Sequence, residues 1–290
     1  MAKRARSVRV EEGKVEEYAA GLAGSAEAGS DEGPAGVERD PEAAAAFAIC
    51  LNAINFGSGW WPTIRKRPGL SGYGTMAAGV EDRFAAAGPW SAEELEAMDA
   101  AAIAAVVGQG PEHPLMAQFA AALRDVGAHL AGYDGRYLGV AEAAESIPGL
   151  AGALAGWVSF ADASRYAGRE VPFFKRAQLA AADLHRAGVA PLPGFERLTA
   201  FADNLVPHVL RIDGILELEP ALTTRIEAEE LLMHGSPEEV ELRACAVHAI
   251  ELLAGGSGLV PAEVDAALWN RGRSRRYKSV PRPRSRNTAY

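Results

Sequence analysis

Cysteine is scarce in this sequence, since only Cys50 and Cys245 occur among 290 residues. Two cysteines exclude a disulfide framework, and these two lack the paired spacing of a zinc site. The histidines form no His-x-x-x-His or Glu-x-x-His pattern on one helix, so we expect neither a metal nor another cofactor. Such sparing use of cysteine is typical of a reducing compartment, and we expect a cytoplasmic protein.

Long apolar runs and a positive net charge are also missing. The most apolar stretch, "AAAAFAICLNAINF", is too short to cross a bilayer and is interrupted by asparagine. The basic start "MAKRARSVRV" leads into acidic residues and not into the apolar core of a signal peptide. A net charge of −9 argues against a surface that tracks nucleic-acid phosphates. We therefore expect no membrane and no direct, stable nucleic-acid partner, which leaves a small anionic ligand held by a few local cations.

Strand-like alternation is rare, and helix signals recur along the chain. Asp40 and Pro41 begin one predicted helix, Ser91 with Glu94 forms a capping box for a second, and Ser236 with Pro237 begins a third that stops at a glycine pair, 255–256. Further helices are predicted near 112–131, 140–157, 172–187, 196–216, 220–233 and 261–271. Only "SVRVEEGKV" alternates, so the prediction is a mostly α protein with at most a small N-terminal β-hairpin.

Composition suggests two parts. Residues 21–38 are rich in Gly, Ala, Ser and acidic residues, which is typical of a linker. We therefore expect an N-terminal segment with a mobile connection over 1–39 and a helical domain over 40–290. The basic C-terminal stretch "NRGRSRRYKSVPRPRSRNTAY" is, by composition alone, either a disordered tail or part of that domain.

The segment 54–75 interrupts the helical pattern with glycines, adjacent tryptophans, Tyr73 and the cations Arg65, Lys66 and Arg67. One interpretation is a surface loop whose aromatic side chains pack onto the core. The other is a site that stacks a heterocyclic base and meets a phosphate, because flat aromatic faces and guanidinium groups supply both contacts.

Two further segments place charge among apolar residues. In "VPFFKRAQL", Lys175 and Arg176 fall in the first turn of a predicted helix, where cations oppose the helix dipole unless an anion lies nearby. The alternative is a pair of snorkelling side chains on a solvated face. In "LTAFADNLVPHVL", Asp203 stands among apolar residues, where a carboxylate is either a structural partner or part of a site.

Several motifs, in this order along the chain, resemble those of the queuosine salvage protein family. They are "NAINFGSGWWP", "LSGYGT", "SFADAS", "REVPFFKRAQLAAADL", "LTAFADNLVPHVLRIDGIL", "GSPEEVELRACAVHAIELL" and "ALWNRGR", and the resemblance runs from "SVRVEEGKVEEYA" to Tyr290. It implies a helical fold similar to helix-hairpin-helix DNA glycosylases. It also implies hydrolysis of the N-glycosidic bond of queuosine 5′-phosphate, which releases queuine for salvage into tRNA modification.

The resemblance assigns roles by motif. Asp203 matches the catalytic carboxylate, and Lys175 its cationic neighbour that holds an anion or orients Asp203. The implied substrate contacts are Asn55, Phe56, Trp60, Tyr73, Asp162, Phe174, Asn204, Arg284, Arg286 and Tyr290. Because the C-terminal stretch takes part in the match, the resemblance favours an ordered end that folds back onto the domain.

The chain departs from the family pattern at three places. Asn204 and Leu205 replace a Tyr-Arg pair, Pro283 stands where a histidine is usual, and Gly74 stands where an aromatic residue is expected. These changes leave the predicted catalytic residues in place but affect ligand preference. A related N-ribosyl hydrolase acting on another nucleotide or on a nucleoside therefore stays open, as do a helical nucleic-acid-binding module and a non-catalytic interaction protein.

Chemistry suggests how a carboxylate would serve such a reaction. Cleavage of a ribose N-glycosidic bond builds positive charge at the anomeric carbon. A fixed carboxylate can stabilise this charge, attack the carbon, or orient a water molecule toward it. A 7-deazapurine lacks N7, so protonation of the leaving group must use another atom or the field of the site. An acidic side chain such as Asp162 could bind the donors of the base.

Overall fold

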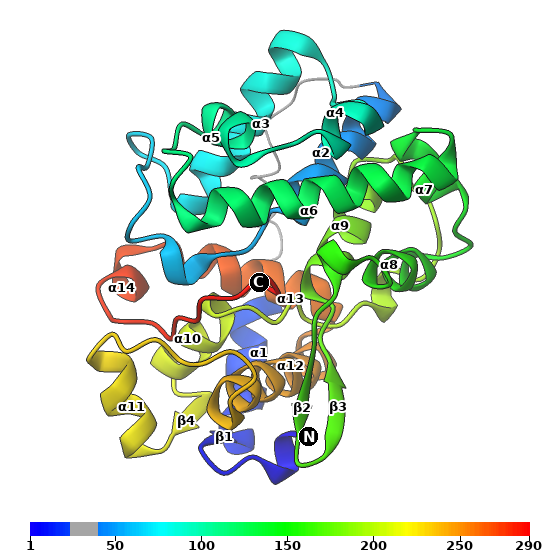
Figure 1. Ribbon diagram of the computed structural model, residues 1–290. Helices are drawn as coiled ribbons and strands as arrows, with labels where there is room; N and C mark the ends of the chain where they lie inside the picture. The colour runs from blue at the N-terminus through cyan, green and yellow to red at the C-terminus, as the bar shows by residue number, and fades with distance from the viewer. Residues whose placement is uncertain (24–39) are drawn as a thin grey trace. The chain divides into compact units, whose positions relative to one another are not determined.

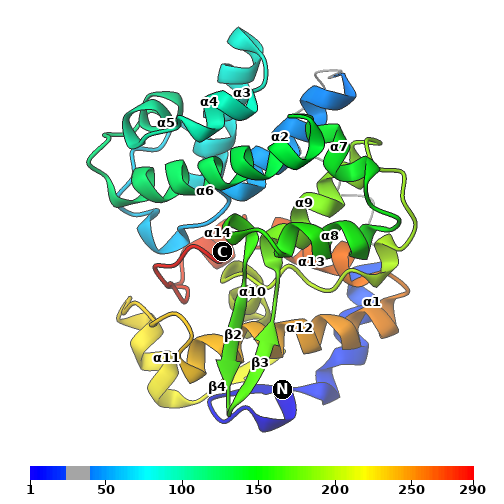
Figure 2. The ribbon, with the colours of Figure 1, turned by 45° about the vertical axis from the view of Figure 1, so that its right-hand side comes forward.

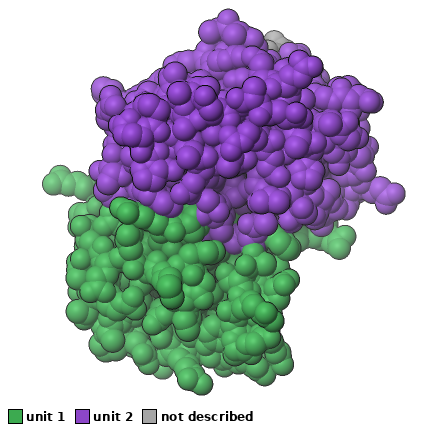
Figure 3. All heavy atoms as spheres, in the orientation of Figure 1, with its two compact units in different colours: residues 1–31, 163–175, 196–287 green, residues 32–162, 176–195, 288–290 purple. Residues whose placement is uncertain are grey.

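The computed structural model describes residues 1–23 and 40–290, and helices dominate them, as the sequence predicted. Most of the predicted linker at 21–38 lies outside the described residues. The contacts divide the chain into two compact units, coloured in Figure 3. Of the described residues, unit 1 holds 1–23, 163–175 and 196–287, and unit 2 holds 40–162, 176–195 and 288–290. The division at residues 39 and 40 made from composition stays a prediction.

Unit 1 is organised around one long helix, α12, which packs against α1, α10 and α13 (Figures 1 and 2). Its helices are α1 Val15–Ala23, α10 Leu205–Ile212, α11 Pro220–Glu227, α12 Pro237–Ser257, α13 Pro261–Arg271 and α14 Arg275–Lys278. The Ser236 hydroxyl accepts from the Glu239 N–H at the start of α12, as the cap motif predicted. The helix ends at Ser257, and Gly258 caps it with a left-handed φ of 76° that suits glycine. It runs just past the glycine pair at which the sequence placed its end.

The strands of unit 1 correct the sequence-based prediction of an N-terminal hairpin. Strand β1, Val8–Val10, pairs antiparallel with the distant β4, Leu216–Leu218, and residues Glu12–Lys14 form a 3-10 turn that leads into α1. Val8 and Leu218 are buried as partners, so the pairing covers apolar surface that a local hairpin would leave open. A second pair, β2 Ala163–Tyr166 with β3 Arg169–Pro172, forms a hairpin that was not predicted.

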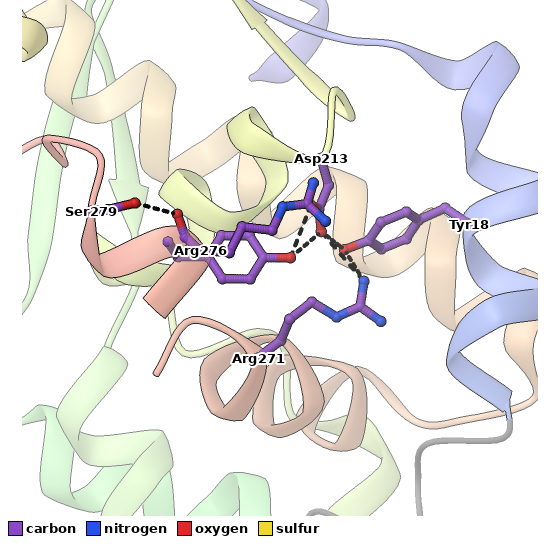
Figure 4. Close-up of polar contacts among 6 residues, drawn as sticks. Tyr18, Asp213, Arg271, Arg276 and Ser279 are labelled. Atoms are coloured by element: carbon purple, nitrogen blue, oxygen red, sulfur yellow. Dashed lines mark hydrogen bonds and ion pairs between the residues drawn. The ribbon is translucent and has the colours of Figure 1, made fainter. Parts of the chain in front are cut away.

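A polar cluster around Asp213 ties together the elements of unit 1 (Figure 4). The carboxylate, with 5% of its side chain exposed, accepts a 2.5 Å hydrogen bond from the Tyr18 hydroxyl and one of 2.9 Å from the Tyr277 hydroxyl. It also pairs with Arg271 at 3.3 Å and with Arg276 at 2.9 Å. One buried carboxylate thus connects α1, α13 and α14 to the end of α10.

Unit 2 is a helical assembly in which α6 packs against α2, α4 and α5 (Figures 1 and 2). Its helices are α2 Pro41–Ala53, α3 Gly72–Ala87, α4 Ala92–Glu96, α5 Ala100–Val107, α6 Pro114–Leu130, α7 Tyr137–Glu142, α8 Ile147–Ala155 and, from its second residue, α9 Lys175–Arg186. Asp40 caps α2 through the Ala43 N–H at 3.0 Å, and the predicted capping box of Ser91 with Glu94 is present. Both caps were correctly predicted from local sequence.

Helix boundaries depart from the predictions where a second cap or a break intervenes. The helix expected to run on from Ser91 divides into α4 and α5, because Asp99 accepts from the Ala102 N–H at 2.8 Å and begins a new helix. The predicted helix at 140–157 likewise covers the end of α7 and all of α8, and 196–216 is helical mainly over α10. Helices α1, α3 and α14 were not predicted.

Among the described residues, no single helix combines the length and apolar character needed to span a bilayer; α12 and α13 reach that threshold only as a pair, bent by 108°.

Candidate functional site

Asp203 lies in the loop before α10, in unit 1, and is half-buried. Its Oδ1 accepts hydrogen bonds from the backbone N–H groups of Leu205, at 2.7 Å, and Val206, at 3.1 Å. These are N–H groups of the first turn of the helix, which have no partner inside it. The carboxylate is therefore held in one orientation, with Oδ1 occupied by the backbone.

Three long-range contacts hold the loop that carries Asp203. Arg243 on α12 donates from Nε to the Ala202 carbonyl at 2.9 Å, and Asp265 on α13 accepts from the Phe201 N–H at 3.0 Å. Asn204 donates from Nδ2 to the Pro283 carbonyl at 2.8 Å. Neighbours of Asp203 on both sides are thus fixed by side chains or backbone from elsewhere in unit 1, so the carboxylate is set on a rigid support.

Lys175, the second predicted catalytic residue, follows strand β3 and begins α9. Its side chain is buried, with 6% of the residue exposed. Phe174, just before it, has a φ of +49°, a conformation that costs a bulky residue free energy and is held only when its surroundings impose it. Strain at this position is a feature often found beside functional side chains.

Arg243 brings the segments of Lys175 and Asp203 together within unit 1. Its guanidinium lies 3.9 Å from the centroid of the Phe173 ring while Nε holds the Ala202 carbonyl. Phe173 and Ala202 also share a small apolar cluster with α12. The residue two before Lys175 and the residue before Asp203 therefore contact the same buried arginine. The pairing of Lys175 with Asp203 stays a prediction.

The C-terminal segment packs onto unit 1 up to residue 287, as the resemblance implied, and is ordered there. Arg284 accepts through its carbonyl from the Leu232 N–H at 2.8 Å, and its guanidinium pairs with Glu229 at 3.2 Å. Arg286 is exposed. The interpretation of this stretch as a disordered tail is wrong for the described structure.

The other predicted contacts belong to unit 2. Phe56 is 1% exposed and meets the Phe119 ring edge-on at 5.0 Å, and Trp60 is buried as well. Asn55 is half-buried and donates from Nδ2 to Asn52 Oδ1 at 3.3 Å. The aromatic residues of this loop thus pack onto the core of unit 2, and a role in stacking a base stays a prediction.

Tyr73, Asp162 and Tyr290 complete the predicted set in unit 2. Tyr73 is half-buried in the first turn of α3, within a segment that was predicted as loop. Asp162 is 2% exposed, and Tyr290 is 4% exposed. The Tyr290 carbonyl accepts from the Gly57 N–H at 3.1 Å, which fixes the C-terminal residue beside the segment that carries Phe56.

Arg176 is buried, so the interpretation of Lys175 and Arg176 as side chains on a solvated face is wrong. Arg176 donates to the carbonyls of Ala53, Thr288 and Ala289, and its guanidinium lies over the Phe56 ring at 4.9 Å. Burial lowers the pKa of Arg176, and the Asp162 carboxylate acts in the opposite direction. This arginine fastens the end of α2 and the C-terminal residues of unit 2.

Arg243 and Asp265, whose side chains hold the loop of Asp203, were not predicted as site residues. Both are buried, but other charged residues stand near them in the sequence, among them Glu241 and Glu263, so their charge alone did not single them out. Among the described residues, no group of three or more His, Cys, Asp and Glu side chains could hold a metal ion.

Taken unit by unit, this is a helical protein in which a carboxylate and several buried cations are fixed by long-range contacts, an arrangement typical of a ligand-binding or catalytic site. The model of the family described as queuosine salvage protein matches residues 36–290. The chain belongs to the queuosine salvage protein family.

Relatives with the name queuosine 5′-phosphate N-glycosylase/hydrolase show the same relationship. The chain is 34% identical to the protein of that name from Sphaerobacter thermophilus over 268 residues, which is 86% of this chain and 82% of the relative. It is 34% identical to the Dictyostelium discoideum protein over 45% of this chain and 44% of that protein. The mouse (Mus musculus) protein is 30% identical over 46% of this chain and 44% of its own length.

Proposed function

We propose that this chain hydrolyses the N-glycosidic bond of queuosine 5′-phosphate and releases queuine. The observation that carries the proposal is the 34% identity, over 86% of the chain, to a relative named for that activity. The fixed carboxylate of Asp203 gives the proposal a chemical centre.

Asp203 is the catalytic carboxylate in this proposal. Its Oδ1 is occupied by the N–H groups of Leu205 and Val206, and Oδ2 makes no hydrogen bond to the residues that the structure describes. Oδ2 is then the oxygen that faces the ribose. As the bond to the base breaks, positive charge grows at the anomeric carbon, and an immobile negative charge beside it stabilises the transition state more than the ground state.

Lys175 and Asp162 have separate roles in this proposal, both carried over by motif. The buried ammonium of Lys175 follows a strained residue, and its segment shares Arg243 with the segment of Asp203, which supports a role in orienting that carboxylate. Asp162 is a buried acceptor, and a carboxylate can receive hydrogen bonds from the amino and ring N–H groups of a guanine-like base. A 7-deazapurine has no N7 to protonate, so these contacts assist departure of the base by holding its donors.

The other contacts in this proposal are Asn55, Phe56, Trp60, Tyr73, Phe174, Asn204, Arg284, Arg286 and Tyr290, carried over by motif. The motifs also support a fold similar to helix-hairpin-helix DNA glycosylases. The net charge of −9 supports a small-molecule substrate over a stable nucleic-acid or membrane partner. Two unpaired cysteines support a cytoplasmic location.

The test is to incubate the purified protein with queuosine 5′-phosphate and, in parallel, with queuosine, and to follow free queuine by mass spectrometry. Asp203→Ala is the control for contaminating hydrolases. Release from the nucleotide that disappears in Asp203→Ala supports both the reaction and its centre. Release of queuine from neither compound would overturn the proposal, and a preference for the nucleoside would redirect it to a different substrate.

A further inference from the structure

Arg243 is buried on α12 and uses several sides of one rigid group. Its side chain is 1% exposed. Nε donates to the Ala202 carbonyl at 2.9 Å, and the guanidinium carbon lies 3.9 Å from the centroid of the Phe173 ring. Because a guanidinium is planar and rigid, a contact at its edge and a contact at its face fix the two partners relative to each other.

Glu239, one turn earlier on α12, is the charged partner of Arg243. Its Oε1 lies 3.8 Å from Arg243 Nη1, and its side chain is 2% exposed. Its Oε2 accepts from the Gly235 N–H at 2.9 Å, so the carboxylate is fixed at the start of the helix. Buried ion pairs add little stability over apolar residues of the same volume. What this pair provides is a fixed orientation of the Arg243 guanidinium.

The segment that carries Lys175 is attached to α12 at both ends of its hairpin. Near the turn, the Tyr166 hydroxyl donates to Glu241 at 2.6 Å. After β3, Phe173 packs against Arg243. Phe174, with its φ of +49°, lies between that contact and Lys175, and such a conformation persists only where the surroundings impose it. Contacts with α12 therefore set the point at which Lys175 enters α9.

The segment that carries Asp203 is attached to the same arginine by a short path. The Ala202 carbonyl, which Arg243 holds, belongs to the residue directly before Asp203. On the other side, Asp203 Oδ1 accepts from the N–H groups of Leu205 and Val206. Few rotatable bonds therefore separate Arg243 from the carboxylate.

We propose that Arg243 is a positioning residue, which holds Phe173 and Ala202 in one register and so sets the distance between the Lys175 ammonium and the Asp203 carboxylate. This inference rests on the proposed function, in which these two groups act together. Misplacement of a reacting group by about 1 Å can lower a rate about a hundredfold. Arg243 acts through Lys175 and Asp203 and needs no contact with the substrate, so its replacement should lower kcat and leave KM nearly unchanged.

The test is a double-mutant cycle on the release of queuine from queuosine 5′-phosphate, with the wild type, Arg243→Lys, Lys175→Met and the double variant. Arg243→Lys keeps the charge but loses the planar group, and should lower kcat about 10- to 100-fold with KM within about threefold. When Lys175 is already methionine, the same change should lower kcat by less than about threefold, because the distance that it disturbs no longer matters. Equal factors in both backgrounds, or no loss in Arg243→Lys, would overturn the proposal.

Arg271→Lys is the matched control. Arg271 also lies in unit 1, with its guanidinium over the Tyr18 ring at 5.1 Å and paired with Asp213 at 3.3 Å. This change should leave kcat within about twofold of the wild type. If Arg243→Lys does not fold, Phe173→Leu takes its place in the cycle with the same expected factors, because it removes the ring and keeps the bond from Arg243 to Ala202.

Hydrogen exchange keeps the inference separate from the reaction. Arg243→Lys should speed exchange in peptides from both 163–175 and 196–206, and Phe173→Leu, a change in the first segment, should speed it in the second. Arg271→Lys should change neither. If the wild type releases no queuine, the proposed reaction fails, and exchange alone decides whether Arg243 couples the two segments. Faster exchange confined to the segment that carries the substitution, or to one segment in Arg243→Lys, would overturn the coupling.

Discussion

The guanidinium of Arg176 lies over the ring of Phe56, 4.9 Å from its centroid, in the core of unit 2. The same group donates to the carbonyl of Ala53, at the end of α2, and to the carbonyls of Thr288 and Ala289. A helix end has carbonyls without an intrahelical partner, and a guanidinium has enough donors to satisfy several carbonyls at once. Arg176 is thus a structural centre that fastens the C-terminal residues to α2.

Replacing Arg176 by leucine should lower the free energy of unfolding by about 3 kcal/mol or more, because several buried carbonyls lose their donor. Arg176→Lys should recover only part of this, since an ammonium cannot span the same set of acceptors. Urea unfolding followed by circular dichroism measures both. Arg186→Lys, at the exposed end of α9, is the matched control and should change stability by less than about 0.5 kcal/mol. A leucine variant as stable as the control would contradict the structural role.

Asp203→Asn should lower kcat for queuosine 5′-phosphate by about a thousandfold or more while the melting temperature stays close to that of the wild type. The asparagine oxygen can still accept from the N–H groups of Leu205 and Val206, so the loop keeps its support. What disappears is the negative charge beside the anomeric carbon.

Asp99→Asn is a matched control, because Asp99 caps α5 through the Ala102 N–H at 2.8 Å in the same manner. It should keep wild-type kcat. Turnover by Asp203→Asn within tenfold of the wild type would remove this carboxylate from the mechanism.

Local signals in the sequence predicted the parts of the fold that depend on a few neighbouring residues. Asp40 and Ser91 were correctly assigned as caps because a cap needs only its own side chain and an N–H three residues on. Pairing of Val8 with Leu218 was not predictable in this way, since their buried contact joins residues more than two hundred positions apart. The capping role of Asp99, which divides one long helical pattern into two helices, was also not predicted.

The candidate site shows the same limit more sharply. Asp203 and Lys175 could be chosen from the sequence as candidate site residues because each is a charged residue beside apolar neighbours and lies in a motif that matches a family. The residue that links their segments, Arg243, needed the structure, because its contacts with Phe173 and Ala202 span three separate parts of the chain.

Both cysteine thiols should resist modification in the native protein. Burial raises the pKa of Cys50 to about 12, with the Tyr137 hydroxyl opposing the effect, and burial with the Glu241 charge raises that of Cys245 to about 12. Thiolate, the reactive form, is therefore scarce at pH 8. An aromatic disulfide reagent should react slowly with the native protein and rapidly with two thiols in guanidinium chloride. Cys50→Ala should leave one reactive thiol after unfolding, and rapid reaction before unfolding would contradict the packing.

The Asp213 cluster should make stability fall in alkali. Burial, and then hydrogen bonding to Asp213, raises the pKa of Tyr18 and of Tyr277 above the ordinary value of about 10. Because their pKa values are raised in the folded state, the protonated hydroxyls of Tyr18 and Tyr277 contribute fully to stability below pH 10. This contribution is lost as the pH rises through the folded values, because the unfolded chain releases these protons first.

Tyr18→Phe tests this sign. The variant should be less stable than the wild type at pH 8 by about 1–2 kcal/mol, because the buried carboxylate loses a donor. Between pH 8 and 11 the free energy of unfolding of Tyr18→Phe should then fall by about 1.4 kcal/mol less than that of the wild type. The reason is that one tyrosine that titrates only in the unfolded chain has been removed. Urea unfolding at pH 8, 9.5 and 11 measures both effects. Tyr133→Phe, which removes a hydroxyl with no hydrogen bond among the described residues, should follow the wild-type curve. Parallel curves for Tyr18→Phe and the wild type would show that Tyr18 ionises as easily in the folded protein as in the unfolded chain.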